Sequence, residues 1–284
     1  MPRKPGVYWT ESWNPATGCT PCSPACDHCW ARGMAERLPQ IHAVRRMDFA
    51  GSVGIDSQPL YERVPFSTIT LHPDRLDQPK HWRKPRVAAV SLMGDLFHED
   101  VPREFLVRVW QVMAQNFWQT YLILTKRAER MRQFLDTLSF HTAGIPVSSD
   151  RPHPNVWLGV SVWDQESADK NIPILLDTDA AHRWVSIEPC LGDVCFGCAE
   201  HRWGMDPEDN RRHLDQVILG CESGPGRRPM PHAWARSIRD QCAEAGVPFY
   251  LKQASENEDG TGRVVKEPTL DGKQHLDLAW EAER

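Results

Sequence analysis

Short apolar runs recur along most of the chain and alternate with more polar stretches. A first apolar segment at residues 8–13 is ended by Asn14-Pro15, and further runs lie at residues 87–92, 121–124, 156–162, 184–187, 217–219 and 249–251. These later runs start about thirty residues apart, which leaves room for one helix between successive strands. Buried strands that alternate with helices predict a parallel α/β fold.

Amphipathic stretches fit between several of these strands. Residues 100–117 place apolar side chains on one helical face, with Asp100 as the expected N-cap and Pro102 in the first turn. A second helix is predicted at residues 233–245, where Gly246 and Pro248 end it, and a third at residues 30–38. Because no phosphate-binding glycine loop follows the first strand, a barrel is favoured over an open sheet.

These elements predict one domain over residues 1–253, a partial or complete parallel (β/α) barrel. Residues 40–80 are irregular and rich in glycine and proline, so we interpret them as an insertion. A second insertion, which contains cysteines, is predicted near residues 190–215. Residues 254–284 are predicted to form a polar C-terminal tail or a hairpin over the barrel.

Four of the nine cysteines fall in one short loop after the first strand, namely Cys19, Cys22, Cys26 and Cys29. A short loop brings thiolates to one metal centre at little entropic cost. The spacing Cys22-x3-Cys26-x2-Cys29 resembles that by which radical S-adenosylmethionine (SAM) enzymes hold three irons of a [4Fe-4S] cluster. The set Cys19, Cys26 and Cys29 is the second possibility. Three ligands leave one iron open for SAM, whereas four make an electron carrier or a structural staple.

Composition limits the compartment and the partners of this chain. Its 284 residues contain no apolar run of membrane-spanning length, and its first residues lack the apolar core of a signal peptide. We therefore expect a cytoplasmic protein without a membrane partner, whose reduced thiols bind metal rather than form disulfides. The net charge of −5 gives no global signature of a nucleic-acid binder. The basic runs at residues 83–86 and 126–127 are typical of solvated surface, and most of the twelve tryptophans of packing, with base stacking as the alternative.

Polar residues follow the predicted strands, at the rim where α/β barrels carry their sites. The candidates for cofactor binding are Gly94, Asp95, Lys126, Glu188, Glu222 and Ser223. Gly94 and Asp95 would receive the amino group of SAM, Glu222 would line its ribose or methionine end, and Lys126 would bind a carboxylate or an anionic substrate. Helix caps and ion pairs are the alternative roles for these charged residues.

A second group of cysteines, Cys190, Cys195, Cys198 and Cys221, lies around the later strand ends. Cys195-x2-Cys198 is a compact metal-binding pair, and four thiolates would satisfy either zinc or an auxiliary iron–sulfur cluster. Single cysteines are also common as small buried residues, so packing is the alternative.

Several blocks in a fixed order carry a resemblance to a known family. They lie at residues 13–19, 23–29, 75–79, 95–102, 124–127, 157–162, 186–189, 222–225 and 248–253. Through them the chain resembles a phage-associated, uncharacterised family with a three-cysteine motif that is suspected to be radical SAM-like. The family pattern uses Cys19, Cys26 and Cys29 and has another residue type at the position of Cys22. The general radical SAM spacing favours Cys22, so the third ligand stays open between Cys19 and Cys22.

The resemblance implies an iron–sulfur enzyme that cleaves SAM to start radical chemistry, with a nucleotide or a nucleic-acid base as a possible substrate. Such an enzyme takes its electron from a reductant protein such as a flavodoxin or a ferredoxin. The alternative is a binding module for nucleic acid or protein that is stapled by zinc or a cluster and performs no radical chemistry.

Overall fold

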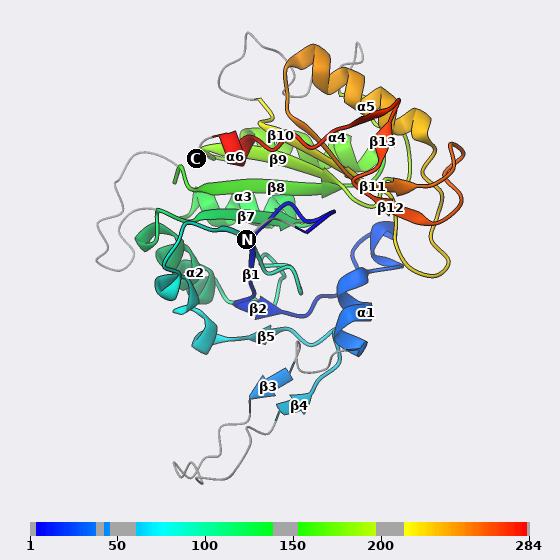
Figure 1. The fold of residues 1–284 in the computed structure, drawn as a ribbon. Helices are drawn as coiled ribbons and strands as arrows, with labels where there is room; N and C mark the ends of the chain where they lie inside the picture. Colours follow the sequence, from blue (N-terminus) through cyan, green and yellow to red (C-terminus); the bar gives the residue numbers. More distant parts are fainter. Residues whose placement is uncertain (1–3, 38–42, 46–60, 139–152, 197–212, 283–284) are drawn as a thin grey trace, which may run out of the picture.

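The computed structural model describes residues 4–37, 43–45, 61–138, 153–196 and 213–282. Within these ranges eight strands form one curled sheet, whose spatial order repeats their order in the chain (Figure 1). The strands are β1 (Glu11–Trp13), β6 (Val87–Val90), β7 (Thr120–Thr125), β8 (Val156–Val162), β9 (His182–Ile187), β10 (Gln216–Gly220), β11 (Phe249–Ser255) and β12 (Val264–Lys266). The chain is thus a mixed α/β protein, as the sequence pattern predicts.

Neighbouring strands from β1 to β11 are parallel, and only β12 is antiparallel to its neighbour. Sequential parallel order is the topology of a (β/α) barrel, because a doubly wound sheet reverses its strand order. Here β1 and β12 remain the two edges, so the sheet is a half-barrel. All carboxyl ends of the parallel strands therefore lie along one rim.

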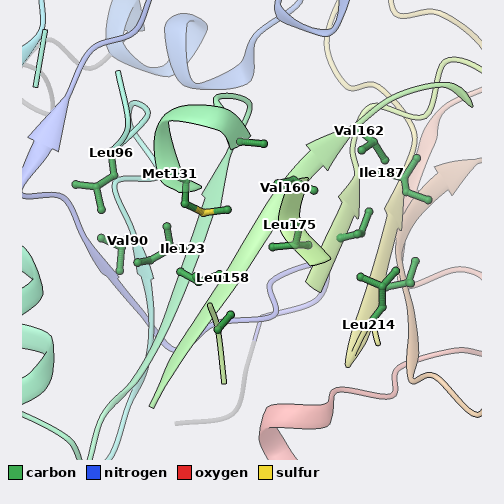
Figure 2. Close-up of a cluster of buried hydrophobic side chains, with 14 of the residues drawn as sticks. Val90, Leu96, Ile123, Met131, Leu158, Val160, Val162, Leu175, Ile187 and Leu214 are labelled. Atoms are coloured by element: carbon green, nitrogen blue, oxygen red, sulfur yellow. The ribbon is translucent and has the colours of Figure 1, made fainter. Parts of the chain in front are cut away.

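Four helices form the outer layer: α2 (Arg103–Gln115), α3 (Ala128–Asp136), α4 (Gln165–Asp177) and α5 (His232–Ala245). The main apolar core lies between these helices and the convex face of the sheet. Figure 2 shows part of it, where Val160 and Val162 of β8 lie among side chains of neighbouring elements such as Leu175. The sequence pattern did not resolve α3 and α4, and the expected N-cap of α2 was wrong. The helix begins only after Pro102, whose backbone is extended, and the N–H of Asp100 donates to Nδ1 of His98 (3.1 Å).

Aromatic side chains fill the lower part of the concave face. They are Tyr8, Trp157, Trp184, Tyr250 and Trp280, all at most 4% exposed. A Cβ on Gly159 would come within 2.4 Å of the Trp184 ring, so this glycine makes the space that the indole occupies. Trp280 belongs to α6 (Ala279–Ala282) near the C-terminus, and its indole donates to the carbonyl of Tyr8 (3.2 Å). The segment after β11 therefore contributes to the interior of the half-barrel.

The remaining described elements lie outside the sheet. Two-residue strands β2 (Ala16–Thr17) and β5 (Thr70–Leu71) pair with each other, as do β3 (Ala43–Arg45) with β4 (Tyr61–Arg63) and β13 (Thr269–Leu270) with β14 (Lys273–Gln274). Short helical segments are η1 (Pro24–Cys26), α1 (Trp30–Arg37), η3 (Pro73–Arg75) and η4 (Gln78–His81). The middle of the insertion predicted near residues 40–80, and most of that near 190–215, lie outside the described residues. No helix in the described ranges has the length and apolarity needed to cross a membrane.

Candidate functional site

The cysteine loop, residues 18–29, crosses the rim formed by the strand ends and leads into α1 (Figure 1). Gly18 forms a parallel bridge with Gly94, which follows β6, and the N–H of Gly18 donates to the carbonyl of Met93 (2.8 Å). A Cβ on Gly94 would lie 2.6 Å from the carbonyl oxygen of Gly18. Gly94 is therefore needed for the close approach of two backbones. Its observed role is to let the backbone of the loop pack closely against the rim.

Three of the four loop cysteines line one cavity of about 530 Å³. These are Cys19, Cys26 and Cys29, each half-buried, whereas Cys22 is exposed and does not line it. Arg32 and Glu36 of α1 and the segment 64–67 form the rest of its wall, together with Thr20, Pro21 and Ala35. The cavity wall thus contains Cys19, Cys26 and Cys29, while Cys22 lies outside it and is hydrogen-bonded to Cys26.

The first attachment of the loop, the Arg127 anchor, is a buried ion pair. Arg127 Nη1 lies 3.2 Å from Asp95 Oδ2, and both side chains are at most 7% exposed. The hydroxyl of Thr125 donates to the other oxygen of Asp95 (2.7 Å). The guanidinium also reaches the loop, where Nη1 donates to Cys19 Sγ (3.5 Å) and Nη2 to the carbonyl of Thr20 (3.3 Å). One cation thereby joins the ends of β6 and β7 to a candidate ligand sulfur.

Polar neighbours extend the Arg127 anchor. Arg127 Nε donates to Glu99 at 3.0 Å, and Nη2 lies 3.3 Å from the hydroxyl of Thr20. His98 Nε2 lies 2.8 Å from the same hydroxyl. Since His98 Nδ1 accepts from the N–H of Asp100, its Nε2 carries the proton and donates to Thr20. Burial and the nearby Arg127 charge lower the pKa of His98, so it is neutral in this network.

The second attachment, the Glu222 anchor, lies after β10. The carboxylate of Glu222 accepts from the backbone N–H of Arg228 (2.8 Å) and from its guanidinium, and His28 Nδ1 lies 2.9 Å away. Arg228 also donates to the carbonyl of Pro24 (3.0 Å) and to Asp27 (3.4 Å). Burial alone would raise the pKa of Glu222, but these hydrogen bonds outweigh it and lower the pKa to about 2. This anchor fixes the part of the loop that contains Cys26 and Cys29.

The thiols of the loop are electrostatically different. A hydrogen bond with Cys22 lowers the pKa of Cys26 well below its usual value, and the charge of Lys126 acts in the same direction. Burial raises the pKa of Cys19 to about 11, although Arg127 counteracts this. Because the thiolate is the metal-binding form, Cys26 is the most readily available ligand of the two.

Further polar groups lie on the concave face of the sheet, next to the aromatic side chains that fill its lower part. Lys252 Nζ and Glu188 Oε1 form an ion pair at 2.7 Å, and the hydroxyls of Ser186 (2.9 Å) and Tyr8 (3.4 Å) donate to the other oxygen. Burial, followed by the Glu188 charge, raises the pKa of Tyr8, which keeps the phenol protonated. Ser161 is the strand neighbour of Ser186 and is 1% exposed, yet its hydroxyl has no hydrogen-bond partner among the described residues.

The structure separates the predicted cofactor-binding residues by role. Asp95 and Glu222 are engaged in the two anchors, Glu188 pairs with Lys252, and Gly94 seats the loop. Lys126 is half-buried, and its backbone N–H donates to Asp95 (3.2 Å). Ser223 is half-buried beside Glu222. The ion-pair roles weighed for Asp95 and Glu222 are thus the ones observed.

The second group of cysteines is only partly described. Cys190 and Cys221 are buried free thiols on neighbouring strand ends, where the N–H of Cys190 donates to the carbonyl of Gly220 (3.0 Å). Burial raises the pKa of Cys190 to about 12 and that of Cys221 to about 11. Cys195 takes part in a disulfide, so the expectation that it is a reduced thiol free to bind metal was wrong, and Cys198 lies outside the described residues.

Donor chemistry decides which metal group fits the loop. No set of three or more histidine, cysteine, aspartate or glutamate side chains in the described ranges is arranged around a single metal ion. A [4Fe-4S] cluster takes one thiolate per iron, so its ligands surround a cubane rather than converge on a single ion. Three half-buried thiols on one cavity wall match that donor set.

Sequence reasoning missed the residues that attach the loop. Arg127 directly follows β7 and was expected at the rim with Lys126, but its contact with the loop was not predicted. Arg228 lies in a loop six residues beyond Glu222, and no spacing rule connects it to His28. Thr20 and His98 meet across 78 positions of sequence, a contact that no local pattern encodes.

The fold and the cavity define this protein as an α/β half-barrel with a three-cysteine site at the carboxyl ends of its strands. The chain belongs to the DUF5131 family, described as proteins of unknown function, whose model matches residues 4–279. Comparison with curated proteins and with solved structures gave no match.

Proposed function

We propose that this protein is an iron–sulfur enzyme of the radical SAM type, in which Cys19, Cys26 and Cys29 hold a [4Fe-4S] cluster. The observation that carries the proposal is the shared cavity, which includes these three thiols and leaves Cys22 outside. When bound, such a cluster supplies the electron that cleaves SAM and starts hydrogen abstraction from a substrate. Three protein ligands are the number that leaves one iron open for SAM.

The two anchors support this proposal because they fix the loop from both sides. Arg127 holds Cys19 and Thr20, and the Glu222 anchor holds the backbone from Pro24 to His28. A cluster site requires sulfurs in set positions before the cofactor arrives, and buried ion pairs restrict such motion. The guanidinium beside Cys19 also favours negative charge on that sulfur.

The concave face provides suitable groups for the polar parts of SAM or of a substrate. Lys126 lies close enough to Cys26 for its charge to lower the pKa of that thiol, and it would bind a carboxylate. Glu188 and Lys252 provide an acceptor and a donor on the same face, and Ser161 offers an unpaired hydroxyl. Asp95 and Glu222 are already paired, so we assign them to holding the loop rather than to contacting SAM.

The test is anaerobic purification followed by iron, sulfide and zinc analysis, with electron paramagnetic resonance of the dithionite-reduced protein with and without SAM. We expect about four irons per chain and a reduced-cluster signal that changes when SAM is added. Zinc alone, with no response to SAM in the reconstituted protein, would overturn the proposal. It would favour the alternative of a binding module stapled by metal.

Single cysteine variants sharpen this test, because Cys22 is a matched control within the same loop. We expect Cys22→Ala to retain the iron content and the SAM-dependent signal. Cys19→Ala should lose both. The reverse result would replace the ligand set by Cys22, Cys26 and Cys29, whereas loss in both variants would mean that all four thiols are needed and that no iron is open.

The proposed chemistry also requires a source of electrons and a substrate. A flavodoxin- or ferredoxin-type reductant is the expected donor. A nucleotide or nucleic-acid base is the substrate class that the family context favours, and the half-barrel rim is where it would bind.

A further inference from the structure

Two aromatic rings protrude from the turn between α2 and β7. Phe117 is 71% exposed and Trp118 is 45% exposed, and their centroids lie 5.3 Å apart with an interplanar angle of 80°. The flanking residues Asn116 and Gln119 are buried and fix the turn, since Gln119 N–H donates to the carbonyl of Asn116 (3.0 Å). Because the turn is fixed on both sides, the two rings between Asn116 and Gln119 point into solvent. Large exposed rings gain nothing from folding, which indicates a role outside the fold.

A basic turn is hydrogen-bonded to the turn that carries these rings. The side chain of Gln119 accepts from the N–H of Arg86 (2.6 Å) and donates to the carbonyl of Trp82 (3.4 Å), so it connects the two turns. Arg83 and Lys84, between these two contacts, are exposed. Arg86 is paired with a carboxylate of β1, but no carboxylate among the described residues pairs with Arg83 or Lys84.

These four side chains, Arg83, Lys84, Phe117 and Trp118, form what we term the aromatic–basic surface. It precedes β6 and β7 and so lies at the amino ends of the strands, whereas the cysteine loop crosses their carboxyl ends. The surface is therefore separate from the proposed cluster site, and its properties do not depend on a bound cluster.

We infer that the aromatic–basic surface binds single-stranded nucleic acid. Cations attract the phosphates, and exposed rings stack with bases whose faces are open only in a single strand. The whole chain carries a net charge of −5 and would repel a polyanion, so the attraction must come from such a local cluster. Stacking tolerates any base, and the surface accordingly binds without strong sequence preference.

The probe is a fluorescently labelled twelve-nucleotide single-stranded DNA, whose anisotropy is measured with the full chain at several salt concentrations. Phe117→Ala/Trp118→Ala should weaken binding about tenfold or more, in line with stacking losses per base. Arg83→Ala/Lys84→Ala should also weaken it and reduce the slope of log K against log salt by about 1.4, the value for two phosphate contacts on a single strand. A duplex of the same sequence should bind more weakly than the single strand.

The control is Lys170→Ala/Lys273→Ala, which removes the same charge from exposed positions on α4 and β14. We expect this variant to bind as the wild type does. Absence of binding by the wild-type chain, equal binding by all variants, or an equal loss in the control would each overturn the inference. So would sedimentation showing a dimer that Phe117→Ala/Trp118→Ala dissociates, because the surface would then join two copies of the chain.

All substituted side chains are exposed and outside the apolar core, so the variants should fold, which circular dichroism would verify. The outcome is also independent of the proposed radical chemistry. If the chain binds DNA but holds no iron, this inference stands and the proposed function fails. If the chain has a SAM-responsive cluster but does not bind DNA, the proposed function stands and this inference fails.

Discussion

Both anchors attach the cysteine loop to the rim of the sheet, but their charged side chains are buried to different degrees. In the Arg127 anchor the central pair, Arg127 and Asp95, is at most 7% exposed, and only the outer partner Glu99 is exposed, at 65%. In the Glu222 anchor the carboxylate is 3% exposed, but its partner Arg228 is 33% exposed and Asp27 is 62% exposed. The first contacts a candidate ligand sulfur directly, and the second contacts the backbone between ligands.

This difference predicts unequal consequences when either anchor is broken. Removing one member of a buried pair leaves the other charge without water or counterion, which costs far more than losing an exposed pair. Solvent can replace part of the Glu222 anchor, because Arg228 already has access to water. The Arg127 anchor therefore contributes more to the free energy of unfolding. The Glu222 anchor mainly fixes the local geometry of the loop.

The largest effect is expected for Arg127→Met, which keeps the bulk of the side chain and removes its charge. Asp95 is then left buried and unpaired, so we expect a loss of about 3–5 kcal/mol in the free energy of unfolding. Urea denaturation with and without the substitution measures it. The exposed Arg132→Met, which loses only surface pairs with Glu129 and Asp136, should change the free energy of unfolding far less than Arg127→Met does.

A double substitution separates the charge from the packing. If the unpaired carboxylate causes the loss, Asp95→Asn combined with Arg127→Met should recover a substantial part of the stability. If the double variant instead lost as much free energy of unfolding as the two single variants together, Asp95 and Arg127 would not be one buried pair.

An intermediate effect is expected for Glu222→Gln. The amide still accepts hydrogen bonds but no longer compensates the Arg228 charge, so we expect a loss of about 1–2 kcal/mol. Hydrogen exchange of the amides around His28 should accelerate more than exchange in the sheet. The control is Glu258→Gln, since Glu258 forms an exposed pair with Arg236, and its loss should lower the free energy of unfolding less than Glu222→Gln does. If Glu222→Gln lowered the free energy of unfolding as much as Arg127→Met, the two anchors would not differ in their contribution to stability.

The smallest effect concerns pH and His98. Burial and then the Arg127 charge lower the pKa of His98, while the charges of Glu99 and Asp100 oppose them. The unfolded chain therefore binds more protons below its ordinary pKa of about 6.5, and stability falls as pH drops through that range. His98→Asn should flatten the dependence of unfolding free energy on pH by at most about 1.4 kcal/mol per pH unit.

His153 and His275 also have pKa values lowered by burial, so part of the slope should persist in this variant. An unchanged slope in His98→Asn would mean that this histidine is not held neutral by the Arg127 anchor.

The parallel α/β class could be predicted because the strands are buried on both faces. Residues 156–162, mostly apolar apart from Ser161, form a fully buried strand in the structure. Element ends were less accurate. The first strand was expected over residues 8–13 but spans Glu11–Trp13, because Tyr8 turns into the concave interior and packs with Trp184. Propensity alone cannot distinguish a strand residue from a buried aromatic beside it.

The sequence by itself determined that the thiols are clustered and that polar residues follow the strands. Cysteine spacing is a local property, and parallel strands place their ends on one rim, so both could be read without coordinates. Only the tertiary structure decided which thiols share a cavity, that Asp95 and Glu222 are paired, and that the turn containing Phe117 and Trp118 is hydrogen-bonded to the turn containing Arg83 and Lys84. The physical reason is that ion pairs and cavities depend on distances between segments far apart in the chain, which no local pattern of residues encodes.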